Sequence, residues 1–170
     1  AALPRCRRPR RQGRPASEGA AGHRLTVLID THCHLADPAF AADREAVVAR
    51  MGAAGVGRAL VIESVRDQLD ATLAWVAASP VLALATGCHP HDASRWSPAL
   101  ADRLARVWRD PSVRAAGEMG LDYHYDHSPR ARQREAFDAQ LAIAAGAGKP
   151  AVIHAREADD DVAAVLRGHP

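Results

Sequence analysis

Cysteines are scarce in this chain, and none of them is spaced for a disulfide framework or a thiolate zinc site. The 170 residues include Cys6, Cys33 and Cys88, an odd number with no Cys-x-x-Cys pair. Such usage argues against a secreted disulfide scaffold and suits a reducing compartment. We therefore expect a cytoplasmic protein.

Long apolar runs are missing as well. No segment approaches the ~20 apolar residues that cross a bilayer. The basic N-terminal segment also lacks the apolar stretch of a secretory signal. We therefore expect no membrane partner. The overall composition, 48% hydrophobic and 25% charged, is that of an ordinary globular domain.

Charge is distributed unevenly along the chain. Residues 1–24 hold seven arginines and one acid, Glu18, whereas the remainder holds 15 basic and 19 acidic residues. An arginine-, glycine- and proline-rich segment cannot bury enough apolar surface to fold alone. We expect residues 1–24 to be a disordered leader and residues 25–170 to form one domain.

Short apolar segments alternate with amphipathic segments after residue 24. Five segments read as buried strands, and each is followed by a segment that reads as a helix. The expected strands are 25–30, 58–64, 81–87, 113–120 and 150–155, and the expected helices are 43–55, 67–79, 97–109, 129–148 and 157–168. Asp43 and Ser97 are expected N-caps, with Pro98 at the first helical position and Gly55 as a helix stop. Five such units predict a parallel sheet, either open and doubly wound or part of a (β/α)8 barrel.

Histidines and carboxylates gather at the ends of these strands, where both architectures place their chemistry. His32 and His34 are two residues apart, so on an extended chain both imidazoles reach one cation while Cys33 points away as a packing residue. Glu118 after the fourth strand can bridge two cations, and His154 on the fifth adds a nitrogen. This mixed set suits Zn, Mn, Fe or Co and admits Mg.

Three further residues are candidates for substrate binding. His89 and His91 are either additional metal ligands or groups that hold a substrate phosphate, and the proline between them favours the positioning role. Arg156 offers a guanidinium for a phosphate or carboxylate, or else forms a salt bridge with Glu157 or Asp159.

The stretches DTHCHL, GCHPH, GEMGLDY and KPAVIHAR, in this order, resemble those of the TatD-type metal-dependent hydrolases, a deoxyribonuclease family. The resemblance covers about residues 26–157. It implies a (β/α)8 barrel with two divalent cations (Mg, Mn or Zn), and hydrolysis of DNA phosphodiester bonds. It assigns His32 and His34 to one cation, Glu118 to the bridge and His154 to the second, with His89 and His91 lining the pocket.

The resemblance also implies a partial barrel, since the later strands of the family supply one more histidine ligand and a catalytic aspartate. We expect that general base to lie beyond Pro170, so no residue of this chain is assigned as catalytic, and we expect the fragment to turn over slowly or not at all. Two alternatives stay open: an amidohydrolase-like enzyme acting on a small C–N or ester substrate, and a non-catalytic metal-binding fragment. We expect a monomer in each case.

Overall fold

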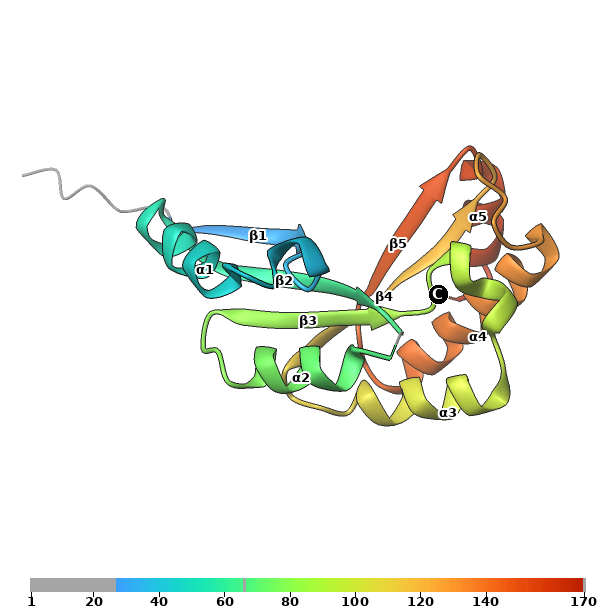
Figure 1. The fold of residues 1–170 in the computed structure, drawn as a ribbon. Coiled ribbons are helices and arrows are strands. Elements are labelled where there is room, and N and C mark those ends of the chain that lie inside the picture. The colour runs from blue at the N-terminus through green and yellow to red at the C-terminus, as the bar shows by residue number, and fades with distance from the viewer. Residues whose placement is uncertain (1–26, 66, 170) are drawn as a thin grey trace, which may run out of the picture.

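The computed structural model describes residues 27–65 and 67–169, which form a single curved parallel sheet covered by helices on one side (Figure 1). The expected leader at 1–24 and the start of the first expected strand lie outside the described residues. The strands are β1 Leu28–Cys33, β2 Val56–Ser64, β3 Leu82–Gly87, β4 Val113–Asp122 and β5 Ala151–Arg156. The helices are α1 Arg44–Ala53, α2 Leu69–Ala77, α3 Pro98–Val107, α4 Arg130–Gly146 and α5 Asp159–Leu166, with 3-10 turns η1 Pro38–Phe40 and η2 Pro90–Arg95.

The order of the strands separates the two architectures that the sequence left open. All neighbours pair in parallel, in the order β1-β2-β3-β4-β5. A doubly wound sheet reverses its strand order at a switch point, whereas a (β/α)8 barrel adds its strands consecutively. The sheet also curls, so that β5 stands steeply to β1–β3 while α2, α3 and α4 lie along its convex side (Figure 1). The fold is therefore a partial barrel of five βα units, as expected.

The main core lies between the sheet and the helices. Alternate residues of β2 and β3, such as Val61 and Leu84, point toward Trp108 and Phe137, and all four are fully buried. The indole Nε1 of Trp108 donates a 2.8 Å hydrogen bond to the carbonyl oxygen of Thr86 and ties α3 to β3. Since successive residues alternate across a strand, a second, smaller cluster of Ile62, Ala85 and Ala115 occupies the opposite, concave side of the sheet.

Element boundaries mostly follow the expectations. Ser97 caps α3 by accepting a hydrogen bond from the Leu100 amide, and Pro98 begins the helix, as predicted. Asp43 is the N-cap residue of α1, as predicted, but its carboxylate makes no capping hydrogen bond and accepts one from Arg50 instead. The first strand runs to Cys33, three residues further than expected, which places His32 inside it.

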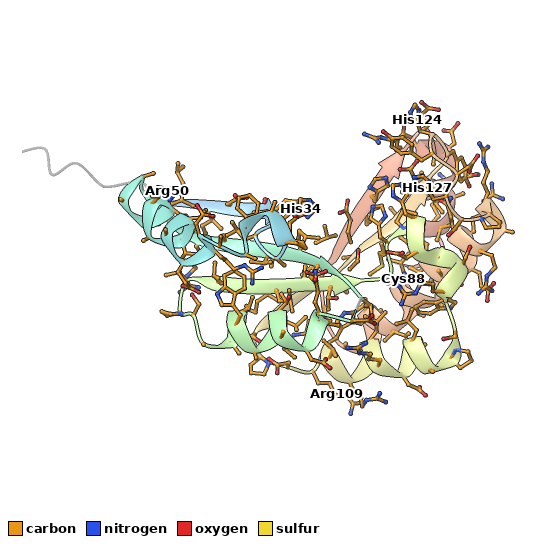
Figure 2. All side chains as sticks on the ribbon, viewed as in Figure 1. His34, Arg50, Cys88, Arg109, His124 and His127 are labelled. Atoms are coloured by element: carbon orange, nitrogen blue, oxygen red, sulfur yellow. The ribbon has the colours of Figure 1, made fainter. Side chains whose placement is uncertain are left out.

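Apolar side chains are most exposed on β1. Leu28 and Ile29 are 56% and 62% exposed, because within the described residues β1 pairs only with β2. None of the described helices has the length and apolar character needed to span a membrane. In Figure 2, Arg50 lies on α1, Arg109 follows α3, His34 lies near the end of β1, and His124 and His127 lie at the top of the view, between β4 and α4.

Candidate metal centre

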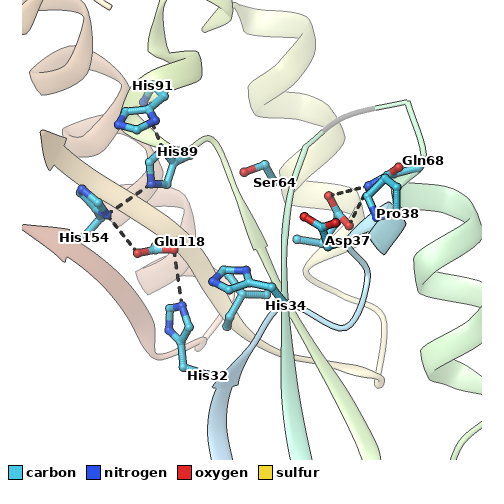
Figure 3. Close-up of a pocket in the computed structure, with 12 residues that line it drawn as sticks. His32, His34, Asp37, Pro38, Ser64, Gln68, His89, His91, Glu118 and His154 are labelled. Carbon is cyan, nitrogen blue, oxygen red and sulfur yellow. Dashed lines mark hydrogen bonds and ion pairs between the residues drawn. The ribbon is translucent and has the colours of Figure 1, made fainter. Parts of the chain in front are cut away.

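A cleft opens at the carboxyl ends of the strands, on the concave side of the sheet (Figure 3). Its walls carry most of the residues that the sequence singled out, brought together from β1, η2, β4 and β5. The lining residues are His32, His34, Asp37, Pro38, Ile62, Glu63, Ser64, Gln68, His89, His91, Glu118 and His154. The expectation that strand ends converge on one site therefore holds for every predicted site residue except Arg156.

His32 and His34 face the cleft together from the end of β1. Their ring centroids are 5.0 Å apart, and ligand atoms of both lie within 4.8 Å of a Glu118 carboxylate oxygen. Cys33 points the other way, with its sulfur 3.4 Å from the carbonyl oxygen of Leu60 on β2, and burial raises the pKa of its thiol. Alternation along an extended strand thus separates two imidazoles from one packing thiol.

Glu118 lies between two groups of histidines. Its Oε2 atom is 3.6 Å from His32 Nε2, and its Oε1 atom is 3.1 Å from His154 Nδ1. Glu118 is also the one residue common to the triads His32–His34–Glu118 and His89–Glu118–His154, each of which has donor atoms close enough for one cation. The hydrogen bond from His154 lowers the pKa of Glu118 despite its burial. The same hydrogen bond is the main cause of a raised pKa at His154.

This donor set fits a divalent cation. Imidazole nitrogen and carboxylate oxygen are ligands of Zn and Mn, and a carboxylate with two separately directed oxygens can serve two cations. Two triads that share Glu118 match that requirement on the positions of the side chains alone.

His89 and His91 take different positions although Pro90 alone separates them. His89 Nε2 is 3.3 Å from His154 Nδ1, inside the cleft, and its Nδ1 accepts a hydrogen bond from the His91 amide. Burial, with repulsion from His154, lowers the pKa of His89 to about 4, so it is neutral at pH 7. His91 turns its Nε2 toward Asp122, at 2.8 Å. His89 is therefore placed with the candidate ligands, while His91 belongs to an adjoining polar network.

Arg156 lies outside the cleft. Its guanidinium carbon is 5.1 Å from the centroid of the Tyr125 ring, a cation–π contact, and the residue is exposed. Among the described residues, neither predicted salt bridge of Arg156 forms. Glu157 pairs with His124 instead, and Arg156 makes no ion pair with Asp159. Its predicted contact with substrate stays a prediction.

Asp122 is a functional candidate to which the sequence analysis gave no role. The carboxylate is fully buried at the end of β4 and contacts His91 Nε2 and His154 Nε2 at 2.8 and 2.9 Å. Burial opposes its ionisation, but hydrogen bonds from the Tyr125 amide and the two histidines hold its pKa well below the ordinary value. Its position four residues after Glu118, at a strand end, was the available signal.

Two buried glutamines of α4 were also missed. Gln140 accepts a hydrogen bond from the Cys88 amide at 2.7 Å and donates to the Cys88 carbonyl at 3.1 Å. Gln133 holds the amide and carbonyl of Asp122 in the same way, at 2.7 and 3.0 Å. Seven residues apart and therefore on one face of the helix, they fasten the ends of β3 and β4 next to the candidate site.

Comparison with known proteins gives one family. The family model described as TatD related DNase matches residues 29–169. The chain is 37% identical over 139 residues to the 3'-5' ssDNA/RNA exonuclease TatD of Enterobacter lignolyticus, covering 82% of this chain and 54% of that protein. It is 34% identical over 141 residues to the uncharacterized metal-dependent hydrolase YabD of Bacillus subtilis, covering 83% and 55%.

A solved structure agrees with these matches. The crystal structure of YJJV, a TatD homologue from Escherichia coli K12, superposes with a TM-score of 0.79 at 33% identity, covering 85% of this chain and 57% of that one. The chain therefore spans about half the length of the curated relatives that it matches.

Proposed function

This chain belongs to the TatD related DNase family of metal-dependent hydrolases, and from that premise we propose that it binds two divalent cations (Mg, Mn or Zn) and serves the hydrolysis of phosphodiester bonds in DNA. The observation that carries the proposal is the position of Glu118, whose two carboxylate oxygens face separate histidine groups. His32 and His34 would hold one cation, Glu118 would bridge, and His154 would hold the second.

When bound, a pair of divalent cations neutralises charge on phosphoryl oxygens and lowers the pKa of water. The residues of this chain would supply the binding and the orientation. His89 is neutral at pH 7 and accepts the His91 amide at Nδ1, so its proton sits on Nε2, directed into the cleft toward His154. We propose that this N–H donates to a phosphate oxygen of the substrate, with His91 fixing the ring behind it. Arg156, on the same strand as His154, is proposed to contact the phosphate backbone from outside the cleft.

The experiment uses a 5′-labelled single-stranded oligonucleotide with Mn²⁺ and the 170-residue chain. We expect products that shorten from the 3′ end, loss of product with EDTA, and a loss of at least tenfold in Glu118→Gln and His32→Ala. Glu135→Gln is the matched control, because Glu135 is an exposed carboxylate on α4. Full activity in Glu118→Gln would rule out the bridging role.

Two further outcomes select the alternatives. Hydrolysis of small esters or amides without cleavage of DNA would favour the amidohydrolase-like function. Binding of Mn²⁺ by calorimetry with no turnover of any substrate would favour the non-catalytic fragment. The cytoplasmic location and the monomeric state stay predictions, which cell fractionation and gel filtration would test.

A further inference from the structure

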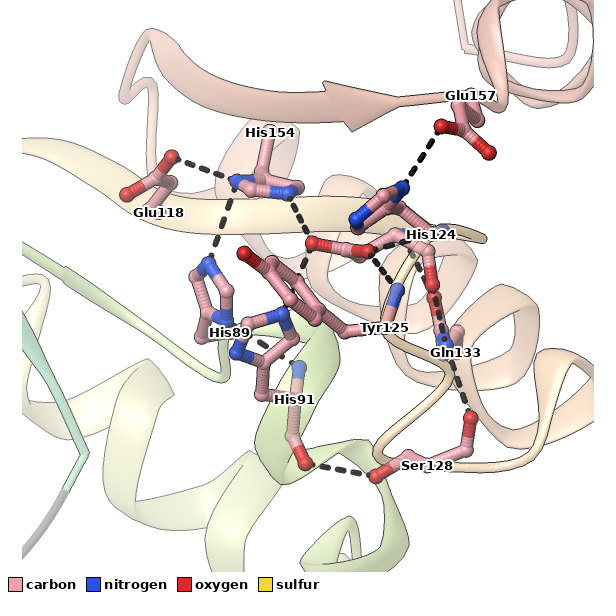
Figure 4. A network of polar contacts seen from close by, with 10 residues as sticks. His89, His91, Glu118, His124, Tyr125, Ser128, Gln133, His154 and Glu157 are labelled. Atoms are coloured by element: carbon pink, nitrogen blue, oxygen red, sulfur yellow. Dashed lines mark hydrogen bonds and ion pairs between the residues drawn. The ribbon is translucent and has the colours of Figure 1, made fainter.

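Asp122 makes four hydrogen bonds from a position without solvent contact. Figure 4 shows the four residues that supply them, His91, His124, Tyr125 and His154. The Oδ1 atom of Asp122 accepts from the backbone amides of His124 and Tyr125, at 3.1 and 2.9 Å. Its Oδ2 atom faces Nε2 of both His91 and His154. Because an ionised carboxylate only accepts hydrogen bonds, each of these ring nitrogens must carry a proton to satisfy it.

The same rule applies to Glu118, which faces the other ring nitrogen, so a charged His154 donates to both carboxylates and a neutral His154 must release one of them. A neutral imidazole carries one proton, so a proton on Nε2 leaves the lone pair on Nδ1. Nδ1 is the nitrogen that faces Glu118 Oε1, at 3.1 Å, and His89 Nε2, at 3.3 Å.

A second chain of hydrogen bonds reaches the same assignment from the other side. The His91 amide donates to His89 Nδ1, so the proton of a neutral His89 is on Nε2. In the metal-free chain with His154 neutral, that N–H points at His154 Nδ1, which is then its acceptor. Asp122 is fully buried whereas the Glu118 side chain is 16% exposed to solvent, so Asp122 loses more when its donor is removed. Both routes, one from Asp122 and one from a backbone amide, therefore place the lone pair of a neutral His154 on the side of the cleft.

We propose that Asp122 is a positioning residue that fixes the Nε2–H tautomer of His154 and so presents its Nδ1 lone pair to the cation site. The proposal rests on the cation site of the proposed function. Carboxylates that hold the far nitrogen of a ligating histidine fix its ring and raise its basicity, and their loss typically weakens metal binding by about 10–100-fold.

Direct ligation by Asp122 is the competing interpretation, since His91, Asp122 and His154 also have donor atoms within 4.8 Å of one another. The geometry disfavours it. Both oxygens of Asp122 are already engaged, and a cation at Oδ2 would have to displace the protons of two imidazoles from a fully buried position.

The first test needs neither a metal nor a variant. Nitrogen-15 spectra of the histidine rings report the tautomer of each neutral imidazole in the metal-free 170-residue chain, at a pH above the titration of His154. We expect His154 as the Nε2–H tautomer. An Nδ1–H tautomer would overturn the proposal whether or not the chain hydrolyses DNA.

The second test is Asp122→Asn, which keeps the shape of the side chain. The two backbone amides require the carbonyl oxygen on their side, so the new NH2 group faces the histidines and donates to Nε2. His154 must then carry its proton on Nδ1, against the cation. We expect Mn²⁺ affinity, measured by calorimetry, to fall at least tenfold and the tautomer to switch.

The matched control is Asp161→Asn, which changes a partly exposed carboxylate that accepts a hydrogen bond from Tyr123 away from the cleft, and this variant should bind Mn²⁺ like the parent. Affinity in Asp122→Asn within twofold of this control, in a folded chain, would overturn the proposal, as would anomalous scattering from Mn²⁺ bonded to Asp122. A parent chain that binds no Mn²⁺ would instead overturn the proposed cation site, while the tautomer of His154 would still decide the role of Asp122.

Discussion

Replacing Gln140 by methionine tests whether α4 fastens the strand ends that carry the site. Methionine keeps the length of the side chain and removes its amide. Gln140 makes three hydrogen bonds, to the amide and carbonyl of Cys88 and to the carbonyl of Ala136. At about 1 kcal/mol of net stability for each bond, the loss is about 3 kcal/mol. The buried backbone amide of Cys88 would be left without an acceptor, which adds to this loss. Burial of the apolar methionine side chain partly offsets it.

Such a loss is a large part of the 5–15 kcal/mol that stabilises a typical domain. The measurement is urea unfolding followed by tryptophan fluorescence, since Trp108 is fully buried in the core beside α4. Gln133→Met should lose a similar amount, because Gln133 also makes three buried hydrogen bonds, to the backbone of Asp122 and Ser128.

Glu135→Met is the control for these variants. It makes a similar change on the exposed side of the same helix, where the ion pair with Arg132 contributes at most about 1 kcal/mol. We call the paired hydrogen bonds of Gln133 and Gln140 to the strand ends the glutamine clamps. If the free energy of unfolding of both glutamine variants lies within 1 kcal/mol of this control, the clamps contribute little to stability and the reasoning is refuted.

Three other predictions follow from the surroundings of the site. Gly120→Ala should destabilise the chain by about 3 kcal/mol or more in the same urea assay, because Gly120 has φ of +144° and an added Cβ would collide with the backbone of His154; unchanged unfolding would contradict the packing of β4 on β5. Burial raises the pKa of the Cys88 thiol to about 12, so this thiol should react with a disulfide reagent ~1000-fold more slowly at pH 8 than an exposed thiol. Site-resolved mass spectrometry measures the rate, and labelling at the rate of a free thiol would contradict the burial of Cys88. The pKa of His154 is raised, so the stability that its pair with Glu118 contributes to the metal-free chain should be complete below pH 6.5 and should decline as the pH rises through that raised pKa. Mn²⁺ affinity should increase over the same pH range, because the cation binds the deprotonated ring. A flat pH profile in both measurements would contradict the pairing.

Sequence reasoning located the five βα units because their signals are local. A short apolar run between turn residues reads as a buried strand without knowledge of its neighbours, and Pro98 marks the start of α3 by its fixed φ alone. Strand order is not local. Helix packing on one or both faces of a sheet yields the same apolar strands, so only the consecutive order β1-β2-β3-β4-β5 distinguishes a partial barrel from an open sheet.

In the candidate site, too, residues with local sequence signals were predicted and residues that depend on distant contacts were not. His32 and His34 were predictable because spacing along one strand sets their common face, and Glu118 and His154 because parallel strands end at one edge. Asp122 and Gln140 escaped prediction because their roles depend on contacts with residues 32 and 52 positions away in the chain. A buried glutamine in a helix gives no sequence signal that distinguishes a clamp on a strand from an exposed polar residue.

The clamps connect the stability of the chain to its affinity for a cation. Gln140 holds Cys88, the residue before His89, and Gln133 holds Asp122, which contacts His154. A ligand that binds only the folded state stabilises it by RT ln(1 + [L]/Kd), about 2.7 kcal/mol at 100 times Kd. If the clamps also position the donors, a glutamine variant loses both its own hydrogen bonds and part of this gain. Saturating Mn²⁺ should therefore stabilise Gln140→Met less than it stabilises Glu135→Met. Equal stabilisation by Mn²⁺ would mean that the clamps hold the fold without holding the site.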